Sequence, residues 1–140
     1  MNKFELKTSS GEIFAFVSKE KDTPWLYVQW VGKVPLEDLK RSMIQYTDVL
    51  TKQACPYVLS DRRISEGNWF EINHWIEHKW APMAIEAGLQ YIAHVTAPMA
   101  TSQLASQDLA SRIIGFEFQS FESIEDAKSW LRQQIVQIRN

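Results

Sequence analysis

Apolar residues recur along the chain with two different periods, one typical of strands and one typical of helices. Residues 12–17 (EIFAFV) and 25–32 (WLYVQWVG) are rich in β-branched and aromatic residues and predict two strands. Residues 3–7 (KFELK) could pair with the first of these through a turn at 9–11, which contains a glycine. The first part of the chain is therefore expected to form strands only.

From Pro35 onward, helical and strand patterns alternate. Pro35 suits the first position of a helix, and the apolar residues after it recur at intervals of three and four up to Leu50. PYVLSD at 56–61 predicts a short buried strand, and a helix capped by Asn68 is expected to stop at Gly88. The remaining expected elements are a strand at 91–97, a helix at 101–114, a strand at 116–121 and a helix that begins with a capping box at Ser123 and Asp126.

This order of elements predicts the fold class. Strands that alternate with helices indicate an α/β fold with a mixed, mostly parallel β-sheet flanked by about four helices. The 140 residues, 45% of them hydrophobic, suit a single domain over 1–140 with an ordinary core. The aromatic-rich strands look apolar on both faces, so a homodimer that covers one face is compatible with the sequence.

Composition and charge exclude some classes of function. The 15 basic and 17 acidic residues leave a formal net charge of −2, which argues against nucleic-acid binding. The single cysteine, Cys55, cannot form an internal disulfide, so a reducing, cytoplasmic location is expected. The first residues lack the apolar core of a signal peptide, and no apolar run approaches the roughly 20 residues that span a bilayer.

Residues 74–80 (HWIEHKW) contain the H-x-x-E-H pattern of some zinc peptidases. On a helix, His74 and His78 fall opposite the apolar stripe, no third ligand follows, and Pro82 weakens the helix one turn later. A structural helix is therefore favoured over a zinc hydrolase acting through His74, Glu77 and His78. No metal, cofactor or catalytic residue is predicted.

Two other groups of residues are candidates for binding. Phe70 and Trp75 fall on the outer side of the same helix, where they could contact a partner, or a neighbouring segment could cover them. Arg62 and Arg63 follow a predicted strand and could bind an anion in a loop. Alternatively, one arginine pairs with Asp61 and the other is solvated.

Cys55 and His94 have simpler interpretations. Cys55 precedes a proline at a strand entrance and is expected to be a small buried residue. His94 lies in a strand pattern and is expected to be a hydrogen-bonded structural histidine.

Four segments resemble the SpoIIAA-like branch of the STAS superfamily, which is also similar to Sec14-type (CRAL-TRIO) lipid-binding folds. They are VGKVPLEDLKRSM, PYVLSDRR, GLQYIAHV and SFESIEDAKSWL, and the resemblance covers roughly residues 12–135. It implies a sheet with packed helices and a non-enzymatic regulatory module that binds a partner protein. In the anti-sigma-factor antagonists of this superfamily, a loop serine is phosphorylated, and the added charge switches partner binding.

The corresponding loop here departs from that pattern, because Arg62 and Arg63 stand where serines are expected. Ser65 lies nearby but out of register, so a phosphoserine switch there is a hypothesis. The expected partner surface comprises Asp61, Arg62, Arg63, Ser65, Phe70 and Trp75. The alternative function is a carrier or sensor of a small apolar or anionic ligand, or a lipid, held between helices and sheet.

Overall fold

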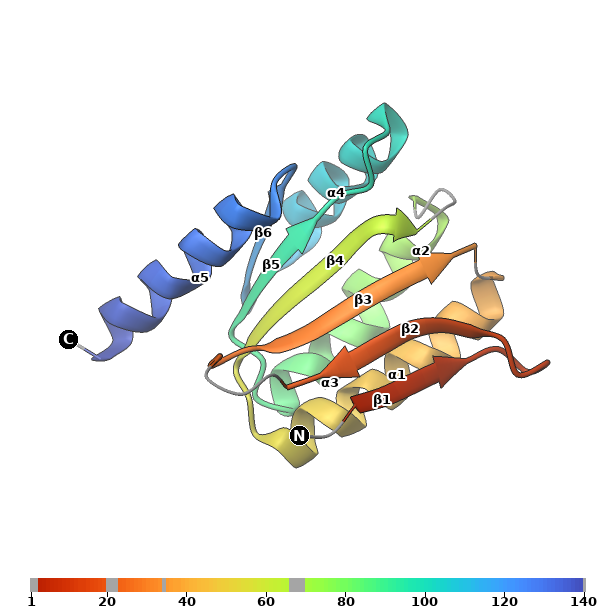
Figure 1. Ribbon diagram of the computed structural model, residues 1–140, viewed down its shortest axis with the longest axis horizontal. Helices are drawn as coiled ribbons and strands as arrows, with labels where there is room; N and C mark the ends of the chain where they lie inside the picture. Colours follow the sequence, from red (N-terminus) through yellow and green to blue (C-terminus); the bar gives the residue numbers. More distant parts are fainter. Residues whose placement is uncertain (1–2, 20–22, 34, 66–69, 140) are drawn as a thin grey trace.

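The computed structural model describes residues 3–19, 23–33, 35–65 and 70–139 (Figure 1). Strands and helices alternate in the expected order. The elements are β1 (Lys3–Lys7), β2 (Ile13–Ser18), β3 (Leu26–Gly32), α1 (Leu36–Gln53), β4 (Tyr57–Ser65), α2 (Phe70–Trp75), the π-helix η1 (Ile76–Trp80), α3 (Ala81–Glu86), β5 (Tyr91–Val95), α4 (Ala100–Arg112), β6 (Glu117–Phe121) and α5 (Ile124–Arg139).

The six strands form one sheet in which spatial order follows chain order, from β1 to β6. β2 is antiparallel to both of its neighbours, β1 and β3, whereas β3, β4, β5 and β6 are parallel. The parallel part has a helical connection between successive strands, as parallel pairing requires. The prediction of a mixed, mostly parallel sheet flanked by helices is confirmed.

One face of the sheet carries the larger core. Side chains of β1–β5 pack there against α1, the α2–α3 segment and α4. In Figure 1, α1 and α3 lie behind the strands. Trp30 of β3 and Tyr46 of α1 stack at 6.4 Å, and Trp80 meets Tyr46 edge-on at 5.5 Å. Much of the aromatic content therefore fills this core.

The opposite face is covered only in part by the described helices. Ala127, Leu131 and Ile135 of α5 pack on Leu59 and on residues of β5. This helix contacts β4, β5 and β6, and Figure 1 shows β1–β3 without a helix in front of them. We call the uncovered surface of β1–β3 and of the end of β4 the open sheet face. It carries the side chains of Phe16, Tyr27, Val31 and Ile64.

The segment from Phe70 to Glu86 is helical throughout but changes its hydrogen bonding. Pro82 has no N–H to donate to the carbonyl of His78, and a π-helix occupies the turn before it, at Ile76–Trp80. Gly88, with φ of +101°, follows the end of the segment as predicted. The predicted cap, Asn68, lies outside the described residues. Among the described helices, none is long and apolar enough to cross a membrane.

Candidate functional site

Strand β4 extends four residues beyond the predicted strand end at Asp61, so the expectation of a loop after Asp61 is wrong. The strand accommodates its charged residues through a bulge, in which Arg62 and Arg63 together lie opposite Trp30 of β3. The pairs on either side of the bulge are Gln29–Asp61 and Val31–Ile64. The bulge explains why Arg62 and Ser65, three residues apart, lie on the same side of the strand.

Asp61 is almost fully buried, yet it is ionised. Burial tends to raise the pKa of its carboxyl group, but hydrogen bonds from Arg63 and Tyr27 outweigh this and hold the pKa below its usual value. Arg63 donates from Nε at 3.0 Å and from its terminal nitrogen at 2.9 Å, a bidentate pair. Burial, and then Asp61, raise the pKa of Tyr27 to about 12. The alternative in which one arginine pairs with Asp61 is confirmed for Arg63.

Arg62 points to the other side of β4 and is only 1% exposed. Its Nε donates to Ser65 Oγ at 3.3 Å. Burial lowers the pKa of its guanidinium to about 10, so the group remains charged at neutral pH. The expectation that the second arginine is solvated is wrong, because the strand continues past Asp61 and its alternation places Arg62 on the same side as Ser60. Ser65 is buried as well, and a kinase would reach it only if the end of β4 opened.

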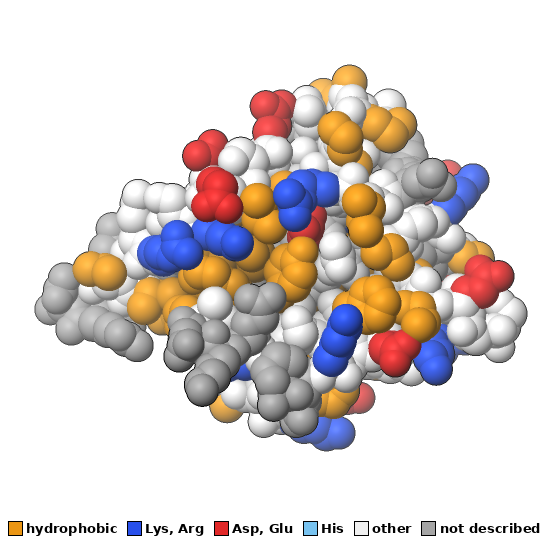
Figure 2. All heavy atoms as spheres, in the orientation of Figure 1, with side chains coloured by type: hydrophobic (Ala, Val, Ile, Leu, Met, Phe, Trp, Pro, Cys, Tyr) orange, Lys and Arg blue, Asp and Glu red, His pale blue; other side chains and the backbone are white. Residues whose placement is uncertain are grey.

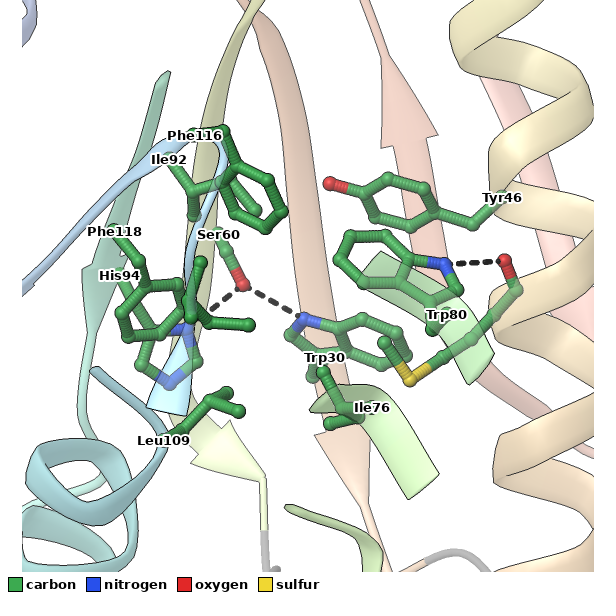
Figure 3. A pocket seen from close by; sticks show the side chains of 12 residues that line it. Trp30, Tyr46, Ser60, Ile76, Trp80, Ile92, His94, Leu109, Phe116 and Phe118 are labelled. Atoms are coloured by element: carbon green, nitrogen blue, oxygen red, sulfur yellow. Dashed lines mark hydrogen bonds between the residues drawn. The ribbon is translucent and has the colours of Figure 1, made fainter. Parts of the chain in front are cut away.

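A second polar group lies beneath the helices on the same side of the sheet (Figure 3). Trp30 Nε1 donates to Ser60 Oγ at 3.0 Å, and Ser60 Oγ shares a hydrogen bond of 3.0 Å with His94 Nδ1. Burial, and then the charge of Arg62, lower the pKa of His94 to about 3. His94 is therefore a buried, hydrogen-bonded, neutral histidine, as predicted.

These groups border a small internal cavity of about 40 Å³. Its walls are almost entirely apolar and come from β3–β6, α1, η1 and α4. The lining side chains are Trp30, Met43, Tyr46, Ser60, Ile76, Trp80, Ile92, His94, Leu109, Ile113, Phe116 and Phe118. Pockets that hold drug-sized ligands usually measure about 300–1,000 Å³, so this cavity is too small for one.

The open sheet face exposes apolar side chains at neighbouring positions of adjacent strands. Phe16 of β2 and Tyr27 of β3 are half-buried, and so is Val31, which pairs with Ile64 of β4. Ile64 is 57% exposed. Figure 2 shows hydrophobic side chains gathered over these strands, with lysine and arginine side chains among them. An apolar cluster of this kind is typical of a contact surface.

The structure does not bring all the predicted binding residues to one surface. Asp61 and Arg63 border the open sheet face, whereas Arg62 and Ser65 point toward the helix-covered side. Phe70 is 40% exposed on α2, and Trp75 is half-buried against the main core. The sequence pattern did not identify the exposed apolar residues Phe16, Tyr27, Val31 and Ile64, because it does not reveal which face of a strand a helix covers.

The histidine motif is on the solvent side of the helical segment, as expected. His74 and His78 are exposed, with ring centroids 4.4 Å apart. Glu77 accepts a hydrogen bond from Arg112 of α4 at 3.0 Å. Among the described residues, no three histidine, cysteine or carboxylate side chains are placed to hold a metal ion. Glu77 thus has a structural partner in this arrangement.

Cys55 is buried, as predicted, and its thiol lies within hydrogen-bond distance of backbone carbonyl groups. The sulfur is 3.3 Å from the carbonyl oxygen of Pro24 and 3.2 Å from that of Tyr57. A thiol held in this way at the entrance to β4 has a packing role.

Comparison with known proteins addresses the fold. The sequence matches no family model and no curated protein. The structure is similar to that of an uncharacterised protein of the DUF3478 family from Shewanella loihica PV-4, described as having a SpoIIAA-like fold. The TM-score is 0.54 at 20% sequence identity, and the match covers 84% of this chain and 91% of that one. The fold is SpoIIAA-like.

The SpoIIAA-like fold agrees with the fold that the sequence resemblance implies. The match covers most of both chains, so most of the element order belongs to this architecture. The fold alone does not identify a function, which has to be argued from the side chains of this chain.

Proposed function

We propose that this protein is a non-enzymatic regulatory module of the STAS type that binds a partner protein through its open sheet face. The observation that carries the proposal is the apolar cluster of Phe16, Tyr27, Val31 and Ile64, which no described helix covers. Removing such a cluster from water favours association by roughly 25 cal/mol for each Å² of apolar surface buried.

The alternative function, a carrier or sensor of a small molecule or lipid, receives less support. A ligand held between helices and sheet needs an internal space of several hundred Å³. The cavity next to Ser60 and His94 measures about 40 Å³, and aromatic side chains fill the space around it. The core is therefore nearly full, which is what a partner-binding module requires.

A non-enzymatic role agrees with the chemistry of the buried polar groups. Ser60 and His94 form a hydrogen-bonded pair that could suggest a nucleophile and its base. A histidine with a pKa of about 3 is a weak base near neutral pH, and the cavity beside it leaves no room for a substrate. We infer that this pair is structural and that the module is a single cytoplasmic domain.

Site-specific photo-crosslinking in the native host tests the proposal. A photoreactive amino acid replaces Ile64 on the open sheet face and, in a control, Ile44 on α1, which is similarly exposed at 43%. We expect a defined protein, identified by mass spectrometry, to crosslink from position 64 and not from position 44. Absence of any crosslink from position 64, or the same proteins from both positions, would contradict the proposed function.

A further inference from the structure

The helix layer on the open side of the sheet is incomplete, and the missing part has the dimensions of one helix. α5 contacts β5 most extensively and β4 and β6 less. β3 lies two strands away from β5, which is about 10 Å at the usual strand spacing. Packed helices lie about 8–10 Å apart. A helix above β3 would therefore contact α5 on one side and cover β2 and β4 below.

One side chain of α5, that of Arg132, reaches from the helix toward the first strands. The guanidinium of Arg132 lies 5.5 Å from the ring centroid of Trp25, which immediately precedes β3, so this side of α5 borders the first strands.

Three cationic side chains, Lys3, Arg63 and Arg132, and two carboxylates, Glu5 and Asp61, lie around the open sheet face. Lys3 Nζ lies 4.3 Å from the ring centroid of Phe16, and Arg132 lies over Trp25. Arg63 neutralises Asp61 and keeps 45% of its own side chain exposed. Glu5 of β1, which lies opposite Phe16 of β2, is an exposed carboxylate on this face. The cationic groups favour a partner that carries negative charge.

We infer that the occupant of this surface is an amphipathic helix of a partner protein with acidic residues along its flanks. This inference rests on the proposed function and gives the partner's chemistry. The apolar stripe of the helix packs on Phe16, Tyr27, Val31 and Ile64, and its carboxylates approach Lys3 and Arg132. A strand is a poor occupant because the backbone groups of the sheet point within its plane and not outward from its face.

Selection from a displayed library of 20-residue helical peptides tests the inference. The affinity of peptides selected on the wild-type protein is then measured for the Ile64→Asp variant. We expect the enriched peptides to carry an apolar stripe flanked by Asp and Glu, and to lose at least tenfold in affinity with Lys3→Glu/Arg132→Glu. The Ile44→Asp variant is the matched control and should bind as the wild type does. A melting curve shows that each variant is folded.

Three results of the peptide selection would overturn the inference. They are an absence of enriched peptides, enriched peptides whose flanks are basic or neutral, and affinity that Ile64→Asp leaves unchanged. A stable dimer in light scattering that Ile64→Asp dissociates would also overturn it, because the occupant would then be a second copy of the chain. The crosslinked segment of the partner distinguishes the two proposals. If a partner protein crosslinks to position 64 through a segment other than an acidic helix, the inference of a helix is wrong and the proposed function stands.

Discussion

At the residue scale, β4 directs neighbouring charged side chains to opposite sides of the sheet. Asp61 receives a bidentate pair from Arg63 and a hydrogen bond from Tyr27, so its charge is compensated at the sheet surface. Arg62 faces the helix-covered interior, where burial disfavours its charge. The cost of burying a guanidinium is usually offset by hydrogen bonds, of which the bond to Ser65 is one.

Charged residues explain why this strand was only partly predicted. The run SDRRISE has the polar composition of a loop, and no apolar alternation continues past Asp61. Pairing with β3 nevertheless extends the strand to Ser65. The pairing of Asp61 with an arginine could be predicted from adjacent opposite charges. The exposure of Ile64 and the burial of Ser65 could not, because a bulge shifts the two-residue period without leaving a mark in the sequence.

The buried neutral His94 makes stability depend on pH. Its pKa of about 3 in the folded protein lies below the value of about 6.5 in the unfolded chain. A depressed pKa contributes stability that is present above pH 6.5 and is lost as the pH falls toward 3. We expect the free energy of unfolding, measured with urea, to decrease by at most about 1.4 kcal/mol per pH unit in this range.

His94→Gln is the matched variant, since glutamine can hydrogen-bond to Ser60 and does not titrate. It should flatten the pH dependence between pH 6.5 and 4. Asp61, whose pKa is also lowered, adds a slope of the same sign, but only below its usual value of 3.8. An equally steep slope in the variant between pH 6.5 and 4 would show that His94 is not its source.

At the element scale, α5 is the one described helix that packs on the second face of β4, β5 and β6. Leu131 is fully buried among Leu59, Ala93 and Val95, whereas Val136 on the same helix is 55% exposed. Leu131→Ala should lower the free energy of unfolding by about 2–5 kcal/mol through lost burial and the resulting cavity. Val136→Ala should change it by no more than about 0.5 kcal/mol. Chemical denaturation compares the two, and similar losses would mean that α5 contributes little to the core.

The elements themselves were largely predictable, for a physical reason. α1 and α5 each present an apolar stripe at helical spacing, and β5 is a short apolar run between polar segments. These local patterns depend only on which face each element buries. The π-helix at Ile76–Trp80 was not predicted, although Pro82 provided the signal that the hydrogen-bonding pattern would change nearby.

At the scale of the whole molecule, the strands differ in how completely they are covered. β5 lies between the two helix layers, whereas β1 is an edge strand with no described helix on its outer face. Amide hydrogen exchange should therefore be slowest in β5, intermediate in β3 and fastest in β1. Protection of β1 equal to that of β5 would contradict this order and would indicate that another layer covers the open sheet face.

The sequence indicated that strands near the start of the chain have two apolar faces, but it did not show which face remains uncovered. The second and third strands look apolar on both faces, as do strands buried between two layers. Over the second and third strands, the described helices provide one of the two covering layers. Which side remains uncovered depends on the direction in which each helix crosses the sheet, and local periodicity does not contain that information.

The sequential strand order has a consequence for how the chain assembles. Each strand pairs with the one synthesised just before it, so the sheet can grow at a single edge as the polypeptide leaves the ribosome. α5 is synthesised last, and until it packs on the sheet, the apolar residues Leu59, Ala93 and Val95 are exposed to solvent. A nascent chain paused before Ile124 would therefore be a strong substrate for chaperones, and its need for them should end once this last helix has emerged.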